Sequence, residues 1–360
     1  MPILSFLFVL SVLILVHEFG HFITARRLGV KIERFSLGFG PVIFSFRGKE
    51  TEYCFSLIPV GGYVKMAGEN PTEALCGERW EYRSQPIRNR FLIVLAGPLL
   101  NYILGFFVFW LVFATGYPTV TPRIGNVVKD YPAEKAGLQE KDLILKIDQH
   151  PVKTWEELTE IIHNTKKEYL ELTLERQGKI MKIAVVPKRE VFTDILGRRQ
   201  EIALIGIKPS EEFTRMRYPF LKSGFLSGKK VLYLTRITFL ALSRLVIGRM
   251  ALKESVSGPL GIFFITKWAA ELGLNALLNL LAVLSISLAL FNILPIPVLD
   301  GGHIFFLIME KIRGRAISVR TQETISRVGM TLLIILMIFV FYNDLIRFQI
   351  LEKIMKFWKR

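Results

Sequence analysis

The segment PILSFLFVLSVLILVHEFGHFITA, residues 2–25, is the most informative part of this sequence. It is almost entirely apolar as far as Val16, and His17, Glu18 and His21 then interrupt it. Its length satisfies the ~20 residues that a helix needs to cross ~30 Å of hydrocarbon. We expect a retained transmembrane helix rather than a signal peptide, because no basic residues precede it, no cleavage site follows and ionisable groups interrupt its apolar core.

The composition places the whole chain in a membrane. Of its 360 residues, 51% are hydrophobic and 22% charged, and the mean hydropathy is +0.39, which is too apolar for an ordinary soluble protein. We attribute the formal net charge of +16 to anionic lipid headgroups and basic cytoplasmic loops rather than to nucleic acid. Cys54 and Cys76 form no CxxC pair and are predicted to be free thiols.

Hydropathy predicts four transmembrane helices, at about 2–25, 91–115, 272–306 and 327–344. Basic residues after the first helix and before the fourth mark those two loops as cytoplasmic, so both termini and the middle of the chain are expected outside. We therefore expect the first two helices with a β-rich cytoplasmic or membrane-associated loop (1–116), an extracytoplasmic α+β domain (117–189), an extracytoplasmic linker with an amphipathic helix on the membrane surface (190–270), and the last two helices with an amphipathic tail (271–360).

The loop between the first two helices is rich in β-forming residues. Residues 42–46 and 52–57 flank a polar turn and predict a hairpin, and an extended segment resumes at 63–66. These strands are unusually apolar for a solvated loop. We therefore expect them to lie against the bilayer or to dip into it.

The five residues from His17 to His21 form an HExxH motif on the first predicted helix. Side chains four apart on a helix stand one above the other, so His17 and His21 suit a single Zn²⁺, and Glu18 reaches a water on the metal. The alternative is a pair of polar side chains packed in a helix bundle. It is disfavoured because ionisable groups at mid-membrane cost about 2.5 kcal/mol or more and seldom persist there without a role.

A catalytic zinc ion needs a third protein ligand and one open position. Asp300 is a carboxylate within the later apolar region, just after a break at Pro295 and Pro297 that bends the backbone toward a cavity. His303 lies three residues further on and is the competing ligand. The spacing favours Asp300 and leaves His303 open.

Three separated motifs resemble the site-2 protease family of intramembrane zinc metalloproteases. They are HEFGH in the first helix, AGPLLN at 96–101 in the second, and Asn292-x-x-Pro295 followed by Leu299-Asp300-Gly301. The order of segments is most similar to the bacterial RseP/RasP type. The resemblance implies one Zn²⁺ bound by His17, His21 and Asp300, with Glu18 as the base and Asn292 as a polar partner of the substrate.

The resemblance also implies the fold, location and activity. It implies a polytopic α-helical protein of the bacterial cytoplasmic (inner) membrane, with about four transmembrane helices, a membrane-associated β-hairpin and one inserted α+β PDZ domain. Its activity would be regulated intramembrane proteolysis of single-span proteins, for example anti-sigma factors or signal-peptide remnants. Transmembrane helices of substrates and membrane lipid are the expected partners, and nucleic acid is not.

A helical substrate must be unwound before its peptide bonds are reachable, and an exposed strand edge holds an extended chain through backbone hydrogen bonds. We expect this edge at the hairpin near 42–57 or at Gly61, Gly62, Tyr63 and Val64. Asn101 is a further candidate, for hydrogen bonds either to the substrate or to the broken backbone of its own helix.

The segment at 131–138, followed by Asp142-Leu143-Ile144, resembles a bacterial PDZ domain. This implies a domain on the extracytoplasmic side that receives a peptide C-terminus or filters substrates by size. One copy is present, whereas two-domain members of the family have tandem copies.

Two other functions compete with the protease. A membrane-anchored PDZ scaffold with a vestigial metal site would not require His17, Glu18, His21 and Asp300 all to be intact. A transporter with broken helices is disfavoured because there is no inverted repeat and few intramembrane charges lie outside the predicted site.

Overall fold

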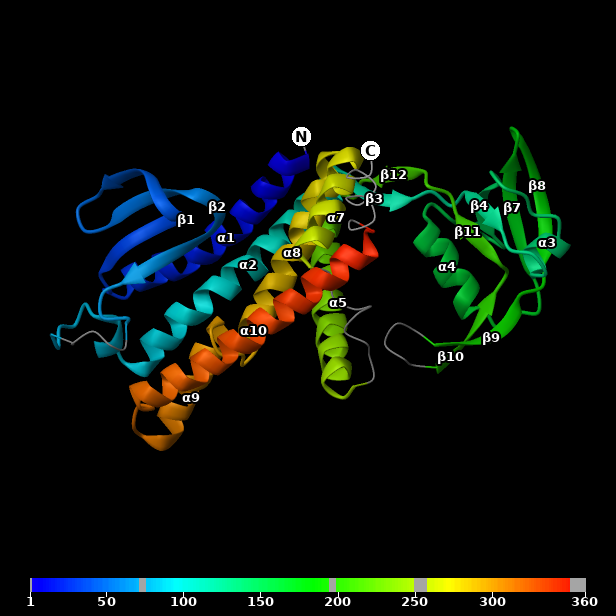
Figure 1. Ribbon diagram of the computed structural model, residues 1–360. Helices are drawn as coiled ribbons and strands as arrows, with labels where there is room; N and C mark the ends of the chain where they lie inside the picture. The colour runs from blue at the N-terminus through cyan, green and yellow to red at the C-terminus, as the bar shows by residue number, and fades with distance from the viewer. Residues whose placement is uncertain (1, 71–75, 194–198, 249–257, 350–360) are drawn as a thin grey trace, which may run out of the picture. The chain divides into compact units, whose positions relative to one another are not determined.

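The computed structural model describes residues 2–70, 76–193, 199–248 and 258–349, which form two compact units (Figure 1). The first unit comprises Met1–Val112, Phe220–Phe239 and Ala251–Arg360, and the second comprises Phe113–Pro219 and Leu240–Met250. The helices that lie wholly or mostly in the first unit are α1 (Pro2–Arg27), α2 (Ile87–Thr115), α5 (Phe220–Val246), α7 (Pro259–Leu272), α8 (Leu274–Ile293), α9 (Asp300–Arg313) and α10 (Val319–Arg347).

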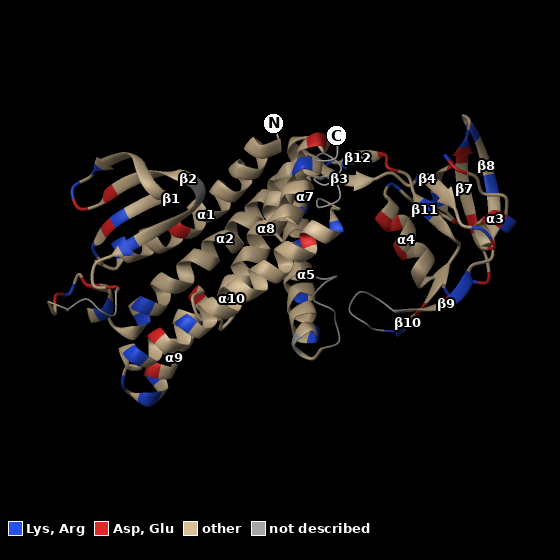
Figure 2. Cartoon of the chain, viewed as in Figure 1, with Lys and Arg blue, Asp and Glu red and all other residues tan. Residues whose placement is uncertain are grey.

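Within the described residues, four helices are long and apolar enough to cross a membrane: α1, α2, α8 and α10. The prediction of four apolar helices is confirmed. The third is shorter than the predicted 272–306, because α8 ends at Ile293 and α9 begins only at Asp300. Neither Pro295 nor Pro297 has an amide hydrogen with which to continue the helix. Figure 2 shows mostly uncharged ribbon along α1, α2 and α8, with Lys and Arg gathered around α9. The predicted C-terminal tail lies mostly at 350–360, outside the described residues.

Helices α1 and α2 pack backbone against backbone. A Cβ atom on Gly20 of α1 would lie 2.3 Å from the carbonyl oxygen of Ala96 in α2, so only glycine permits this approach. Pro98 lies inside α2 and removes one of its hydrogen bonds. Small residues allow close helix contact in a bilayer. The HEFGH turn of α1 therefore lies directly on the AGP segment of α2.

Strands β1 (Ile32–Arg47) and β2 (Glu52–Met66) are both bent, so they pair twice with each other. Across the sheet the segments run in the order 62–66, 32–37, 52–56 and 42–47, as the pairs Val64↔Phe35, Phe35↔Tyr53 and Tyr53↔Phe46 show. The predicted hairpin is thus the outer half of a larger sheet. Among the described strands, segment 62–66 pairs on one side only, and β2 packs against α1.

Helix α5 contains much of the segment predicted to lie on the membrane surface, and it packs against α2. Its first part runs antiparallel along α2: Ser227 donates a hydrogen bond to the carbonyl oxygen of Phe106 (2.6 Å), and Thr235 is hydrogen-bonded to Tyr102 (2.9 Å). Ser223 and Ser227 are fully buried in this contact face. Small and hydroxylic residues of this kind favour helix–helix packing in a bilayer.

The amino end of α7 is capped by a different helix. Asp344 of α10 is fully buried, and its carboxylate accepts hydrogen bonds from the amides of Gly258 (3.2 Å) and Gly261 (2.9 Å). The positive end of the α7 dipole stabilises a carboxylate at this place. This contact joins α10 to α7.

We expect Asp344→Ala to lower the free energy of unfolding by about 1–3 kcal/mol, because two buried amides lose their acceptor. Thermal unfolding in detergent measures the change, with Tyr342→Phe, an exposed position on the same helix, as the control. Equal stability of Asp344→Ala and the control would show that the cap contributes nothing.

The second unit is built on the antiparallel sheet β6-β5-β7-β8 and helix α4 (Trp155–Asn164). Its fully buried apolar side chains include Ile144, Leu158 and Leu172. The strands of this sheet are β5 (Leu143–Ile147), β6 (His150–Pro151), β7 (Leu170–Arg176) and β8 (Lys179–Val185). The remaining elements are β3 (Tyr117–Val120), β4 (Ile124–Val127), α3 (Pro132–Lys135), β9 (Lys188–Thr193), β10 (Arg199–Leu204), β11 (Ile207–Pro209) and β12 (Phe213–Met216).

The second unit extends further along the chain than the expected boundary at residue 189. Strand β11 pairs with β4 and strand β12 pairs with β3, so residues expected in a linker complete the unit. These strands are only three and four residues long. Strands this short carry too little alternation for the sequence to reveal them.

Candidate metal centre

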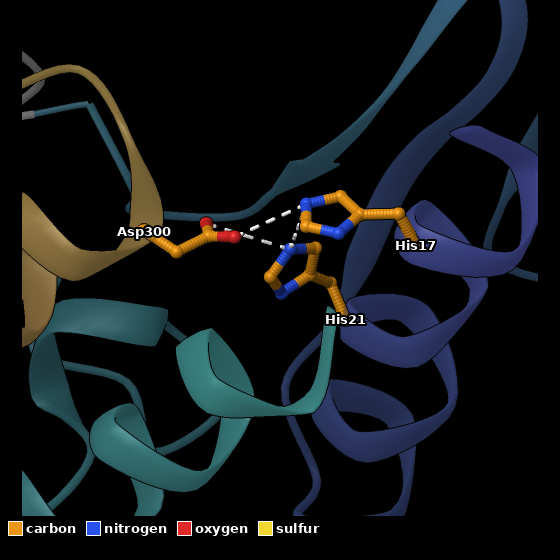
Figure 3. A group of neighbouring side chains, drawn as sticks. All are labelled: His17, His21 and Asp300. Carbon is orange, nitrogen blue, oxygen red and sulfur yellow. Dashed lines mark hydrogen bonds and ion pairs between the residues drawn. The ribbon is translucent and has the colours of Figure 1, made fainter. Parts of the chain in front are cut away.

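The two histidines of the HEFGH motif lie one turn apart on α1 and turn their rings toward α9 (Figure 3). Their Nε2 atoms are 3.3 Å apart, and each residue is only 9% exposed. The helical period alone brings these side chains to the same face. Two imidazole nitrogens therefore converge on one point in a largely buried place.

Asp300, the first residue of α9, completes a group of three. Its Oδ2 lies 3.1 Å from His17 Nε2 and its Oδ1 lies 3.5 Å from His21 Nε2. Zinc bonds of ~2.0–2.1 Å in a tetrahedral arrangement separate neighbouring ligand atoms by roughly 3.3 Å. Within the part of the chain that the structure describes, Asp300 Oδ2 is buried and has no hydrogen-bond partner beyond its ion-pair contact with His17. Donor chemistry, spacing and this unsatisfied oxygen all fit a zinc ion.

A tight bend positions Asp300. Val298, two residues earlier, has a φ of 84°, which is strained for a β-branched residue. A Cβ atom on Gly301 would lie 2.1 Å from the carbonyl oxygen of Leu294, so only glycine allows the start of α9 to fold back on the end of α8. Strain of this kind persists where the surrounding structure fixes it, typically at functional sites.

Helix α2 orients His21. The ring Nδ1 donates a hydrogen bond of 2.8 Å to the carbonyl oxygen of Ile93, so that in the neutral imidazole the lone pair on Nε2 faces the candidate metal position. Gly97 provides the space for both rings, because a Cβ atom there would lie 2.2 Å from His21 Nε2 and 2.9 Å from His17 Cε1. The AGP segment thus contacts both imidazole rings of the candidate metal centre.

Glu18 lies between the histidines and the edge of the sheet. The backbone amide of Val64 donates a hydrogen bond to its carboxylate, and a Cβ atom on Gly62 would lie 3.4 Å from Glu18 Cγ. Glu18, Tyr63 and Val64 line a cavity of about 720 Å³ that also contains the three candidate ligands. The edge segment 62–66 therefore borders the candidate metal centre.

The remaining predicted residues lie at different distances from this centre. Asn292 lines the cavity, with its Nδ2 atom 3.4 Å from His17 Nε2. His303 also lines the cavity but is not one of the three grouped ligands. Gly61 packs on the ring of Phe39. Asn101 is fully buried. The described residues that line the cavity do not include it.

Three residues of the site were not predicted from the sequence. The acceptor for His21 is a backbone carbonyl, that of Ile93, which any residue type supplies. Gly97 was visible in the AGPLLN motif, but its contact with the imidazoles was not. Tyr82 also lines the cavity, and burial, with Glu69 next in importance, raises its pKa, so its hydroxyl stays protonated.

Comparison with known proteins gives a consistent result across nearly the whole chain. A protein of Clostridium acetobutylicum whose name describes a zinc metalloprotease is 34% identical over 337 residues, covering 93% of this chain and 95% of the relative. The regulator of sigma-E protease RseP of Escherichia coli is 30% identical, covering 95% of this chain and 98% of the relative. Both relatives are matched over almost their full length.

The chain is also similar in part to solved structures of PDZ domains. The PDZ domain of the SdrC-like protein of Listeria monocytogenes aligns with 26% of this chain and 88% of that domain, at 23% identity. The TM-score of 0.20 is too low to assign a fold.

The pattern of peptidase family M50 matches residues 5–336. This range contains the HEFGH helix, the AGP segment and the bend before Asp300, and the match confirms the family that these motifs predicted. The chain belongs to peptidase family M50.

Proposed function

We propose that His17, His21 and Asp300 hold the zinc ion of this enzyme, and that Glu18 is its catalytic base. The chain is a zinc-dependent intramembrane metalloendopeptidase, as its family and its zinc metalloprotease relatives support. The observation that carries the residue assignment is the set of three distances, 3.1, 3.3 and 3.5 Å, among one atom of each imidazole and the Asp300 oxygens.

Glu18, Val64 and Asn292 have different proposed roles in the hydrolysis of a peptide bond. A bound zinc ion supplies Lewis acidity, which polarises a carbonyl and lowers the pKa of water toward ~7. Glu18 takes the proton of the attacking water and returns it to the leaving amide nitrogen. The Val64 amide holds the Glu18 carboxylate in place for both transfers. Asn292, on the cavity wall beside His17, offers its amide to the polarised substrate.

The edge segment 62–66 is the proposed docking strand for the unwound substrate. Its support is that it pairs with 32–37 on one side and borders the cavity beside Glu18. Tyr63 in this segment is held by a 3.3 Å hydrogen bond from Arg34. An edge strand recognises backbone rather than side chains, which suits an enzyme that cuts many membrane segments.

The substrates we propose are single-span proteins of a bacterial inner membrane, with surrounding lipid as a further partner. The second unit is proposed to be a PDZ-like domain on the extracytoplasmic side, which binds a peptide C-terminus or filters substrates by size. Its support is the motif at 131–138 and the arrangement of a four-stranded sheet with helix α4.

Zinc binding by the purified full chain in detergent, with cleavage of a model transmembrane substrate, tests the ligand assignment. We expect Asp300→Ala to weaken zinc binding more than ~100-fold, because loss of even an outer partner costs 10–100-fold. His303→Ala is expected to bind zinc like the wild type. The opposite ranking would transfer the third ligand to His303. A wild-type chain that binds no zinc and cleaves nothing would favour the scaffold instead.

A further inference from the structure

An ion pair on the wall of the metal cavity joins two helices. Arg90 of α2 and Glu310 of α9 make a two-pronged contact, with Nη2 2.5 Å from Oε1 and Nη1 3.2 Å from Oε2. The side chains are only 14% and 16% exposed. Arg90 Nε also donates to the carbonyl oxygen of Gln85 (3.1 Å), which fixes the remaining edge of the guanidinium.

This pair connects the two halves of the candidate metal centre. On one side, Arg90 precedes Ile93 by one helical turn, and the Ile93 carbonyl orients His21. On the other side, Glu310 lies on the same continuous helix as Asp300. A helix transmits position along its length, at ~1.5 Å per residue. The place of Glu310 against α2 therefore sets the place of Asp300 against the histidines.

We propose that Arg90 and Glu310 are positioning residues that clamp α9 to α2 and thereby hold the Asp300 carboxylate at ligand distance from the two imidazoles. The proposal rests on the proposed zinc ligands. Asp300 needs such support because it comes directly after a sharp, strained bend at Val298. Metal sites depend on ligand positions held within about 0.5 Å by surrounding residues.

The geometry and burial of the pair suit this role. Ion pairs on an exposed surface contribute little, about 0–1 kcal/mol, because water screens them. Arg90 and Glu310 are instead mostly withdrawn from water, and the two-pronged arginine–carboxylate contact fixes orientation as well as distance. Removal of one partner leaves the other charge buried without compensation. A shift of α9 away from α2 would then expose that charge to water and lower its free energy.

The test measures zinc affinity of the metal-free full chain in detergent, by competition with a chromogenic chelator. Arg90→Gln and Glu310→Gln are each expected to weaken zinc binding about 10-fold, the lower end of the range for supporting residues. Arg90→Lys, which keeps the charge but not the fork, is expected to fall between these variants and the wild type. The exchanged pair, Arg90→Glu with Glu310→Arg, is expected to recover most of the affinity.

Two controls distinguish the clamp from general destabilisation and from a wrong set of ligands. Arg176→Gln breaks a similar two-pronged contact, with Asp142 in the second unit, and should lower stability without changing zinc affinity. His17→Ala should abolish zinc binding. If it does not, the ligand assignment fails, independently of the clamp.

The clamp itself would be overturned in three ways. Wild-type zinc affinity in both single variants would show that Asp300 needs no such support. An exchanged pair no better than either single variant would show that the two residues act separately. An equal loss of affinity in Arg176→Gln would show that general destabilisation accounts for the effect.

Discussion

The Glu18→Gln variant is expected to retain zinc and to cleave a transmembrane substrate about 10²- to 10⁴-fold more slowly, the usual contribution of a general base. Glutamine preserves the shape of the side chain and still accepts the hydrogen bond from the Val64 amide, so the edge segment stays in place. It does not accept a proton from water. The rate of cleavage in detergent and the zinc content of the same sample together measure this effect.

The zinc measurement makes this experiment specific. Glu18 is not one of the three grouped ligand residues, so its replacement should change the rate alone. Turnover equal to that of the wild type would remove Glu18 from the mechanism. Loss of zinc together with activity would instead show that Glu18 is needed for zinc binding.

We expect Gly97→Ala to weaken zinc binding about 10- to 100-fold. The new methyl group would lie 2.2 Å from His21 Nε2, well inside van der Waals contact. The imidazole must then turn away, although its Nδ1 is held by the Ile93 carbonyl. Overpacking of this kind also costs about 1–3 kcal/mol of stability. Zinc affinity and thermal unfolding are the two measurements.

Gly105→Ala is the matched control on the same helix. A Cβ atom there would lie 2.6 Å from Ile286 Cδ1, so it also overpacks a helix contact, but it touches no candidate ligand. It should lower stability and leave zinc affinity unchanged. Similar zinc affinities in both glycine variants would contradict the role assigned to Gly97.

Features that depend on neighbouring residues were predictable. The apolar helices follow from runs of hydrophobic residues, and the shared face of His17 and His21 follows from the helical period. At the start of α4, the Thr154 side chain accepts a hydrogen bond from the Glu157 amide (3.1 Å), a contact between residues only three apart. The family was identified because its motifs are short and contiguous.

Features that depend on distant residues were not predictable in the same way. The strands between 199 and 216 were placed in a linker, although they pair with β3, β4 and β9. The charges of helix α5 suggested a place on the membrane surface, which stays a prediction, but they did not indicate the contact of Ser227 with α2. Pairing partners far along the chain leave no periodic pattern in either segment.

Local sequence patterns were enough to predict a membrane protein with an HExxH helix, a broken late helix that presents Asp300 or His303, and a peptidase family. The packing of α1, α2 and α9 is what brings Asp300 to the imidazoles and places Ile93, Gly97 and the pair Arg90–Glu310 around the site. The physical reason is that a ligand set is a matter of ångströms between separate helices. Side-chain identity specifies which atoms are able to bind a metal, but the packing of backbone against backbone specifies which of them meet.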